Sequence, residues 1–284
     1  METSPWHSEQ ADLETYGERL GITLPAAPPS GREPGPDRLP FSVLSDIHRA
    51  HVAAIPFDNL DLVLDRPVSL ELEAITAKLC GRPRGGCCHE HNLLFAAAVE
   101  RLGYPVTRLA GRVLKGGEGP RPRTHMAVAV RAEGEVWLCD TGFGSGGFVT
   151  PLPLRDGGRA DQGPRAFRVV VHDPFQWRVD ERVPGGWSPL YLLGREPRHP
   201  VDFRVAHHYL TTHPRSMLRH RPFVHRLTAA GDVSLRGHTL TRSTPAGPRR
   251  TELRPGDFEG VLEREFGIVL PDDALRLIVD RTFA

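Results

Sequence analysis

The segment from Arg84 to Asn92 reads Arg-Gly-Gly-Cys-Cys-His-Glu-His-Asn and concentrates nucleophilic and titratable side chains. Two glycines precede a helical pattern, so Cys88 is predicted to lie in the first turn of a helix. The unpaired N–H groups and the dipole at a helix N-terminus stabilise a thiolate. A thiolate is a nucleophile, whereas a free thiol with a pKa of about 8.5 mostly is not. Cys88 is therefore the candidate nucleophile; the competing interpretation is a small buried apolar side chain.

Metal binding is a second interpretation of the same segment, because it holds two cysteines and two histidines. Neighbouring residues on a helix point about 100° apart, so only pairs such as Cys88 with His91 share a face. No second pair at zinc-finger spacing follows, and His89-Glu90-His91 has the wrong interval for a zinc-binding H-E-x-x-H helix. We therefore expect no metal. A non-catalytic protein with a structural Cys/His cluster stays as the alternative from another class.

A nucleophilic cysteine needs a base, and the base needs a group that orients it. Residues 124–130 are predicted to form a strand, and residues 136–140 its antiparallel return. If residues 131–134 form the turn, His125 lies directly opposite Asp140, with Cβ atoms about 4.5–5.5 Å apart. A different turn would shift the register by two residues and leave a diagonal contact. His125 is the candidate base and Asp140 its orienter, against the interpretation of His125 as a surface or core residue.

The elements that must position these side chains are predicted to be helical up to Gly103. Apolar periodicity indicates helices around residues 13–20, 43–54 and 88–102, the last ended by Gly103 and Pro105. This first third is predicted to be a helical bundle.

Strand patterns separated by turn signals follow between residues 106 and 193. They lie at 106–114, 126–130, 136–139, 167–171, 175–179 and 190–193. A small, mostly antiparallel barrel or sandwich fits this spacing. Residues 202–212 indicate a linking helix. Strands near 224–227, 233–235 and 239–241 and helices near 258–265 and 272–277 then indicate a mixed α/β unit.

Composition excludes several classes of protein. The chain has 284 residues, a formal net charge of +1 and 39% hydrophobic residues. It has no apolar run near the roughly 18 residues that a membrane helix requires. The near-zero charge argues against nucleic-acid binding. Residues 1–10 lack a secretory pattern, which predicts a cytoplasmic protein whose four cysteines are thiols.

The combined motif resembles the arylamine N-acetyltransferase family. The sequence Arg-Gly-Gly-x-Cys-x-Glu-x-Asn is followed by a histidine 37 positions after the cysteine and an aspartate 15 positions further on, then by Gly-Phe-Gly. Further similar segments are 12–16, 20–21, 48–51, 55–60, 151–154 and 211–216. The family often has aromatic residues where Cys87 and His89 stand, and a glutamate where Asp58 stands. These departures concern substrate preference more than catalysis.

The resemblance implies an α+β fold: an N-terminal helical bundle, a central antiparallel β-barrel and a C-terminal α/β lid, with a cysteine-protease-like catalytic core. We expect a bundle at 1–103, a barrel at 104–198, a linker helix at 199–220 and a lid at 221–284. The resemblance also implies a catalytic triad of Cys88, His125 and Asp140.

Other residues receive expected roles at the same site. Phe57 and Phe143 are expected to form aromatic walls for the substrate, against the interpretation of ordinary core residues. The glycine-rich run is expected to admit part of the cofactor through its backbone N–H groups, against the interpretation of a flexible turn. Its expected cofactor-binding residues are Gly144, Ser145, Gly146 and Gly147. Arg84, Glu90 and Asn92 are expected to support the nucleophile's loop through a buried ion pair and hydrogen bonds. Cys87 and Cys139 are expected to pack, and Cys80 has no assigned role.

The implied activity is acetyl transfer from acetyl-CoA, as co-substrate, to an arylamine, arylhydrazine or N-hydroxyarylamine through an acetyl-cysteine. The alternative keeps the triad but closes a macrolactam from a carrier-bound polyketide. The expected partner is a small aromatic amine, without nucleic acid or membrane, and a homodimer is left open.

Overall fold

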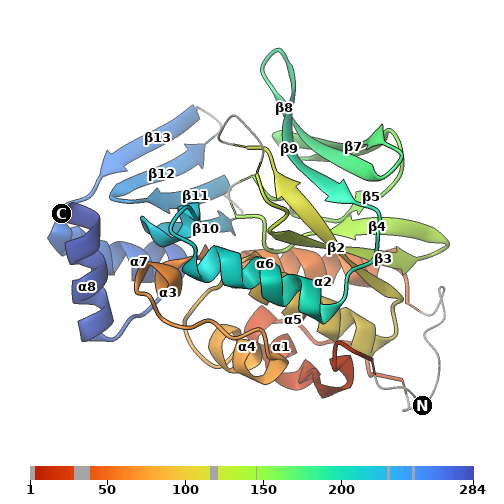
Figure 1. Cartoon of the computed structure of the whole chain (residues 1–284), viewed down its shortest axis with the longest axis horizontal. Helices are drawn as coiled ribbons and strands as arrows, with labels where there is room; N and C mark the ends of the chain where they lie inside the picture. The colour runs from red at the N-terminus through yellow and green to blue at the C-terminus, as the bar shows by residue number, and fades with distance from the viewer. Residues whose placement is uncertain (1–3, 29–38, 116–120, 145, 229–230, 245–246) are drawn as a thin grey trace.

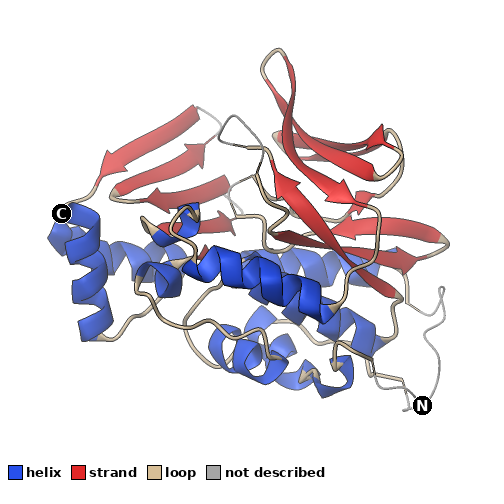
Figure 2. Ribbon diagram, in the orientation of Figure 1, coloured by secondary structure: helices blue, strands red, loops and turns tan. Residues whose placement is uncertain are grey.

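The computed structural model describes residues 4–28, 39–115, 121–144, 146–228, 231–244 and 247–284. Helices lie along one side of the molecule, and two antiparallel sheets stand side by side above them (Figures 1 and 2). The α-helices are α1 (Leu13–Leu20), α2 (Phe41–Ala54), α3 (Leu60–Val63), α4 (Leu72–Leu79), α5 (Cys88–Leu102), α6 (Pro200–Thr212), α7 (Phe258–Phe266) and α8 (Asp272–Phe283). The 3-10 helices are η1 (Ser8–Gln10), η2 (Met217–Arg219) and η3 (Pro255–Asp257).

The larger sheet has eight strands in the order β5-β4-β3-β2-β9-β8-β7-β6 and curls into a nearly closed barrel. Its strands are β2 (Val106–Val113), β3 (His125–Ala132), β4 (Glu135–Cys139), β5 (Leu152–Pro153), β6 (Gly158–Gln162), β7 (Arg165–Asp173), β8 (Gln176–Val183) and β9 (Gly186–Gly194). The smaller sheet has the order β1-β10-β11-β12-β13. Its strands are β1 (Phe57–Asp58), β10 (Phe223–Thr228), β11 (Gly231–Arg236), β12 (Thr239–Thr244) and β13 (Gly247–Glu252). The predicted α+β class with bundle, barrel and lid is confirmed.

Helix α5 is the central element of the helical layer. It carries the alanine-rich run 96–98 between larger apolar residues, and most of its side chains are buried, because α2, α4 and η1 pack around it and β3 lies against it. Gly103 ends the helix in a left-handed conformation, which a residue without a side chain adopts without strain. The helix that begins at Cys88 is therefore fixed on several sides.

The β3–β4 hairpin corrects one prediction from the sequence. Ala132 pairs with Glu135, so the turn contains only Glu133 and Gly134, and not the four residues 131–134. Both turn residues have positive φ, 51° and 75°, as in the type I′ turn whose twist matches that of the flanking strands. The register is therefore shifted by two residues, and His125 is not directly opposite Asp140.

Several elements escaped the sequence analysis, among them β6, β13 and α4. Strands β6 and β13 are rich in polar residues and lie at the edges of their sheets, where strands often carry charged side chains. Helix α4 buries Leu72, Ile75 and Leu79 at helical spacing, a pattern that the analysis passed over. The division of the chain at residues 103, 198 and 220 stays a prediction. Strand β1, from the N-terminal third, pairs with β10 in the C-terminal third.

Candidate active site

Cys88 is the first residue of α5, as the two preceding glycines predict, and its side chain is 6% exposed. The backbone before it lies against the segment that carries Phe57. A Cβ on Gly85 would lie 2.0 Å from the carbonyl oxygen of Pro56. The N–H of Cys87, the N-cap residue, donates to Glu90 Oε2 at 2.9 Å. The side chain of Glu90 thus holds the first turn of the helix that presents Cys88.

His125 and Asp140 form a buried hydrogen-bonded pair. His125 Nε2 donates to Asp140 Oδ2 at 2.7 Å, and the two residues are 3% and 1% exposed. Burial alone would lower the pKa of His125, but the Asp140 carboxylate and the hydrogen bonds of the imidazole outweigh it and raise the pKa to about 10. The ring therefore stays an imidazolium across the physiological pH range.

Cys88 completes the arrangement. Its side chain is a hydrogen-bonding and charge partner of His125, and both interactions raise the pKa of the imidazole. Because Asp140 occupies Nε2, Nδ1 is the ring atom left for the thiol. A Cβ on Gly142 would lie 2.7 Å from Cys88 Cα, so the loop that follows Asp140 lies directly on the nucleophile. The structure brings the three predicted triad residues together.

Asn92, from the second turn of α5, fixes the position of Asp140. Its Nδ2 donates to Met126 O at 2.7 Å and to Asp140 Oδ1 at 3.0 Å. Its Oδ1 accepts from Thr141 N at 3.0 Å. Gly142 N also donates to Asp140 Oδ1, at 3.2 Å. One buried amide thus connects α5, the strand that carries His125 and the loop that carries Asp140.

Arg84 and Glu90 belong to a buried charge network, but they are not paired with each other. Arg84 Nη2 contacts Asp61 Oδ1 at 2.9 Å, and Lys78 Nζ bridges Asp61 Oδ2 at 2.7 Å and Glu90 Oε1 at 2.8 Å. Burial would lower the pKa of Lys78, but its carboxylate neighbours, Glu90 first, raise it. The sequence analysis singled out neither Lys78 nor Asp61. The single ion pair it expected is thus a chain of four charges.

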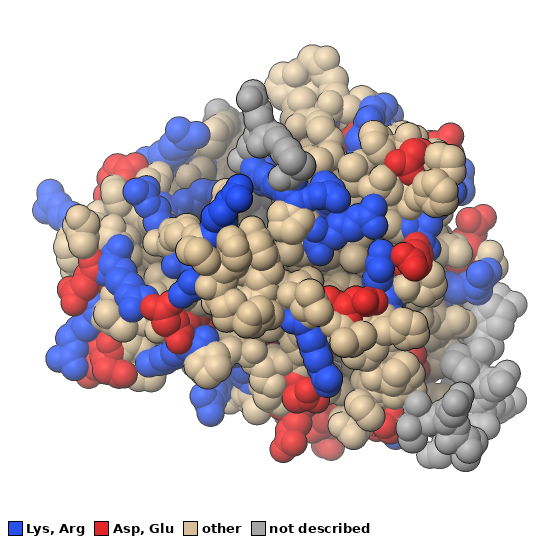
Figure 3. Space-filling model, in the orientation of Figure 1, with Lys and Arg blue, Asp and Glu red and all other residues tan. Residues whose placement is uncertain are grey.

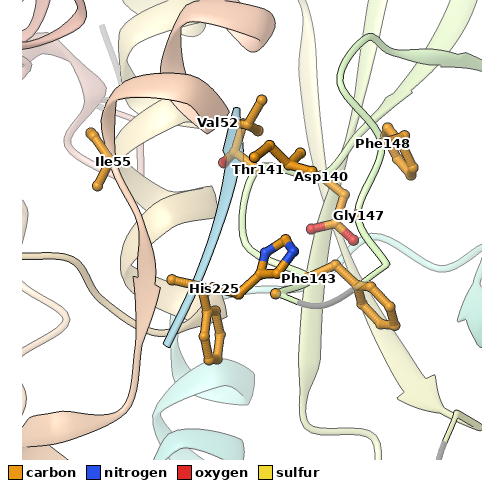
Figure 4. Close-up of a pocket in the computed structure, with 11 residues that line it drawn as sticks. Val52, Ile55, Asp140, Thr141, Phe143, Gly147, Phe148 and His225 are labelled. Atoms are coloured by element: carbon orange, nitrogen blue, oxygen red, sulfur yellow. The ribbon is translucent and has the colours of Figure 1, made fainter. Parts of the chain in front are cut away.

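A pocket opens beside this arrangement, and Figure 4 shows the Asp140 carboxyl group, the Phe143 ring and the His225 ring facing it. Its lining residues are Val52, Ile55, Phe57, Asp140, Thr141, Phe143, Gly144, Gly147, Phe148, His225 and Leu227. Phe143 also meets His125 edge-on, with ring centroids 5.3 Å apart. Both predicted aromatic walls therefore line the pocket.

Only part of the glycine-rich loop lines the pocket. Gly144 and Gly147 line the pocket, and Gly147 O accepts from Arg165 Nη1 at 2.8 Å. Gly146 is not among the lining residues; a Cβ there would lie 2.5 Å from Lys115 Nζ. Ser145 lies outside the described residues.

Some site residues were missed from the sequence. Tyr191 of β9 packs its ring 5.1 Å from that of His125, and burial together with the nearby Asp140 carboxylate raises its pKa. His48 Nε2 accepts from Asp140 N at 3.1 Å. His225 enters the pocket from β10. The Ile-Pro-Phe-Asp-Asn-Leu motif was noticed in the sequence. Its pairing with β10 brings His225 to the site, and no pattern in the sequence near either strand predicts that pairing.

The remaining cysteines are placed away from the pocket. Cys87 Sγ donates to Asp58 O at 3.3 Å, and Cys139 is fully buried in the core around α5. Burial raises the pKa of the partly exposed Cys80 to about 12.

Across the described ranges, no group of three or more His, Cys, Asp or Glu side chains is arranged to hold a metal ion.

On the face that carries α6, a band of Lys and Arg side chains crosses the upper middle of the surface, and acidic side chains are scattered around it (Figure 3). None of the helices in the described part of the chain has the length and apolar character needed to cross a membrane.

Comparison with known proteins adds a consistent set of similarities. A family model described as N-acetyltransferase matches residues 41–275. The arylamine N-acetyltransferase of Mycolicibacterium smegmatis is 36% identical over 273 residues, which cover 93% of this chain and 94% of that protein. The arylamine N-acetyltransferase / N-hydroxyarylamine O-acetyltransferase of Salmonella typhimurium is 32% identical and covers 70% of this chain and 71% of its own length.

Solved structures agree with these similarities. The arylamine N-acetyltransferase from Mycobacterium abscessus superimposes with a TM-score of 0.86 at 30% identity and covers 98% of this chain and 96% of its own. The Mycobacterium marinum arylamine N-acetyltransferase in complex with CoA superimposes with a TM-score of 0.85 at 30% identity, covering 95% and 99%.

Proposed function

The chain belongs to the arylamine N-acetyltransferase family, and from this premise we propose that Cys88, His125 and Asp140 carry an acetyl group from acetyl-CoA to an aromatic amine. The observation that carries the proposal is the hydrogen-bonded line from the Asp140 carboxylate through His125 to a cysteine at a helix N-terminus. This geometry provides a nucleophile, a proton carrier and a group that orients the carrier.

In the first half of the reaction, the Cys88 thiolate attacks the carbonyl carbon of the acetyl thioester. The sulfur–carbon bond to CoA breaks, and the CoA thiolate leaves with the proton of the His125 imidazolium. The products are acetyl-Cys88, neutral His125 and free CoA. Because one thioester is exchanged for another, the enzyme mainly supplies an ionised thiol and a site that excludes water. Backbone N–H groups at the start of α5 are the proposed donors to the oxygen of the tetrahedral intermediate.

In the second half, the nitrogen of the aromatic amine attacks the acetyl-Cys88 carbonyl. The thioester bond breaks, the amide bond forms, and the amine proton passes to His125. This restores the thiolate–imidazolium pair. Asp140 keeps Nδ1 directed at the reacting sulfur throughout, because it holds the opposite ring atom.

The pocket supports both substrates. Phe57 and Phe143 are the proposed walls for the acceptor ring, and the backbone at Gly144, Gly146 and Gly147 is proposed to admit the donor's pantetheine arm. The band of basic side chains in Figure 3 suits the phosphate groups of acetyl-CoA. The acceptor class is arylamines, arylhydrazines or N-hydroxyarylamines. A cytoplasmic location and a homodimer stay predictions.

Initial-rate kinetics tests this function. With acetyl-CoA varied at several fixed concentrations of an arylamine, double-reciprocal plots should be parallel, because CoA leaves before the amine reacts. Intersecting lines would show that the amine binds before CoA leaves and would contradict this order of steps.

The macrolactam-forming alternative is tested with the same enzyme. It requires transfer from a carrier-bound polyketide and no transfer from acetyl-CoA. The relatives named above are arylamine N-acetyltransferases, one of them solved with CoA, so they do not favour this alternative.

A further inference from the structure

His225 presents an unpaired polar atom to the pocket. Its side chain is 4% exposed, and Nε2 is buried without a hydrogen-bond partner in the described part of the chain. Buried side-chain polar atoms nearly always have a hydrogen-bond partner, so an unpaired one that faces a pocket indicates a position where a ligand atom binds. We propose that His225 is a specificity-determining residue, whose Nε2 atom hydrogen-bonds a neutral hydroxyl group on the ring of the acceptor amine. This inference rests on the proposed function.

The position of His225 follows from the sheet that joins the two ends of the chain. Phe57 on β1 is directly opposite His225 on β10. Directly opposed residues in an antiparallel pair project on the same face, with Cβ atoms about 4.5–5.5 Å apart. Both side chains line the pocket, together with Phe143. An acceptor ring packed on Phe57 would therefore present its edge, and the substituents there, to the His225 imidazole.

The charges around His225 select for a neutral partner. Burial, followed by the positive charges of Arg165, Lys115 and Arg236, lowers the pKa of His225 to about 3, so the imidazole is neutral at physiological pH. Asp232 Oδ1 lies 4.0 Å from Nε2, and the Asp140 carboxyl group lines the same pocket. Because Arg165 and Lys115 are already paired with Glu181 and Asp232, neither charge is free to bind an ionised substituent. A hydroxyl group both donates and accepts, so it pairs with a neutral imidazole in either tautomer.

In two other histidines close to the site, both ring nitrogens have hydrogen-bond partners. His48 bonds Val149 O and Asp140 N, and His91 bonds His51 and Pro56 O. His89 also has an unpaired Nε2, but it packs against Phe203 and does not line the pocket. His225 is thus distinguished by having its unpaired nitrogen at the pocket.

Three matched pairs of acceptors test the proposal: 2-, 3- and 4-aminophenol, each against the methylaniline with the methyl group at the same position. The hydroxyl and methyl groups are similar in size, so the ratio of kcat/KM within a pair reports mainly the hydrogen bond. Sites that hydrogen-bond a substrate hydroxyl discriminate against the analogue that lacks it. We expect at least one aminophenol to be preferred by about tenfold in the wild-type enzyme.

His225→Leu should abolish this preference, mainly through KM, and His225→Gln should restore part of it, because the amide can bond the hydroxyl. His172→Leu, a change of the same type at an exposed position on β7, should keep the wild-type ratio. If His225→Leu does not fold, His225→Met provides the same comparison.

An equal ratio in wild type and in the apolar variant would overturn the proposal, as would the absence of any preferred aminophenol in wild type. Mass measurement of wild-type enzyme with acetyl-CoA separates the two claims. Without acetyl-Cys88 the proposed function itself fails; with it, an unchanged ratio refutes only the role of His225.

Discussion

His125 Nε2 and Asp140 Oδ2 are hydrogen-bonded at 2.7 Å, although their residues are not an opposed pair in the hairpin that carries them. Strand β4 ends at Cys139, so Asp140 stands one residue beyond the sheet. Asn92 and Gly142 hold the carboxylate in place from outside the hairpin. The contact therefore depends on α5 and on the loop as much as on strand register.

Replacing Asp140 by Asn tests the orienting carboxylate. The variant should fold. Asn92 and Gly142 donate to Oδ1, so the amide oxygen would take that place and the NH₂ group would face His125 Nε2. That group donates and cannot accept, so it favours the wrong tautomer of the imidazole, with the proton on Nδ1. We expect the rate of Cys88 acetylation to fall by about 10³–10⁴-fold. Stopped-flow measurement of CoA release gives this rate, and wild-type rates in a folded variant would show that Asp140 does not orient the base.

Asn92→Ala should damage both stability and catalysis. The change removes the donor to Met126 O and to Asp140 Oδ1 and the acceptor for Thr141 N. Asp140 Oδ1 keeps Gly142 N as a donor, so two buried groups, Met126 O and Thr141 N, lose this partner. At about 1–3 kcal/mol each, we expect a loss of about 2–6 kcal/mol in the free energy of unfolding. Urea denaturation measures it, with the exposed amide variant Gln10→Ala as control. Equal losses in both variants would contradict the role of Asn92.

Alkylation by iodoacetamide should reveal the ionised thiol. Because the pKa of His125 is raised to about 10, its positive charge stays beside Cys88 from acid pH to well above neutrality. At neutral pH, Cys88 should therefore be alkylated faster in the wild type than in His125→Asn. Cys80, whose pKa burial raises to about 12, is an internal comparison that should stay unlabelled near neutrality. Equal rates for Cys88 in the two proteins would refute the ion pair.

Acid should destabilise the fold through its buried histidines. Burial lowers the pKa values of His48 and His91 to about 4 and of His89 and His225 to about 3. The unfolded chain binds protons at these rings below about pH 6.5, while the folded chain does not. Their contribution to stability is therefore complete above pH 6.5 and is lost as the pH falls through about 4 to about 3. Denaturation curves between pH 7 and 4.5 should show uptake of several protons on unfolding; a pH-independent midpoint would contradict this.

Much of the fold was accessible from the sequence because local patterns specify it. Apolar periodicity located α5, and Gly103 marked its end. The predicted hairpin register was wrong, because the turn between β3 and β4 holds two residues, Glu133 and Gly134. Glu-Gly lacks the asparagine or aspartate that usually marks such a turn in a sequence. Edge strands such as β13 carry mainly polar residues and therefore lack the apolar pattern used to find strands.

The same distinction between features with a local sequence pattern and features without one applies to the site. The three proposed triad residues were selected from type and spacing, since helix starts and hairpins are local, and the structure brings them together. The proposed role of His225 was not, because it depends on the pairing of β1 with a strand more than 160 positions later in the chain. Lys78 of α4 was also missed, since its role arises only where Asp61 of α3 and Glu90 of α5 come within reach of it.

The most direct test of the central claim is the intact mass of the protein after brief mixing with acetyl-CoA and no amine. The account predicts a gain of about 42 Da, located on Cys88 by peptide mapping and released when an arylamine is added. The Cys88→Ser variant, in which an alcohol replaces the ionisable thiol, should gain no mass on the same timescale. An unmodified wild-type protein, or an acetyl group on a different residue, would contradict the account.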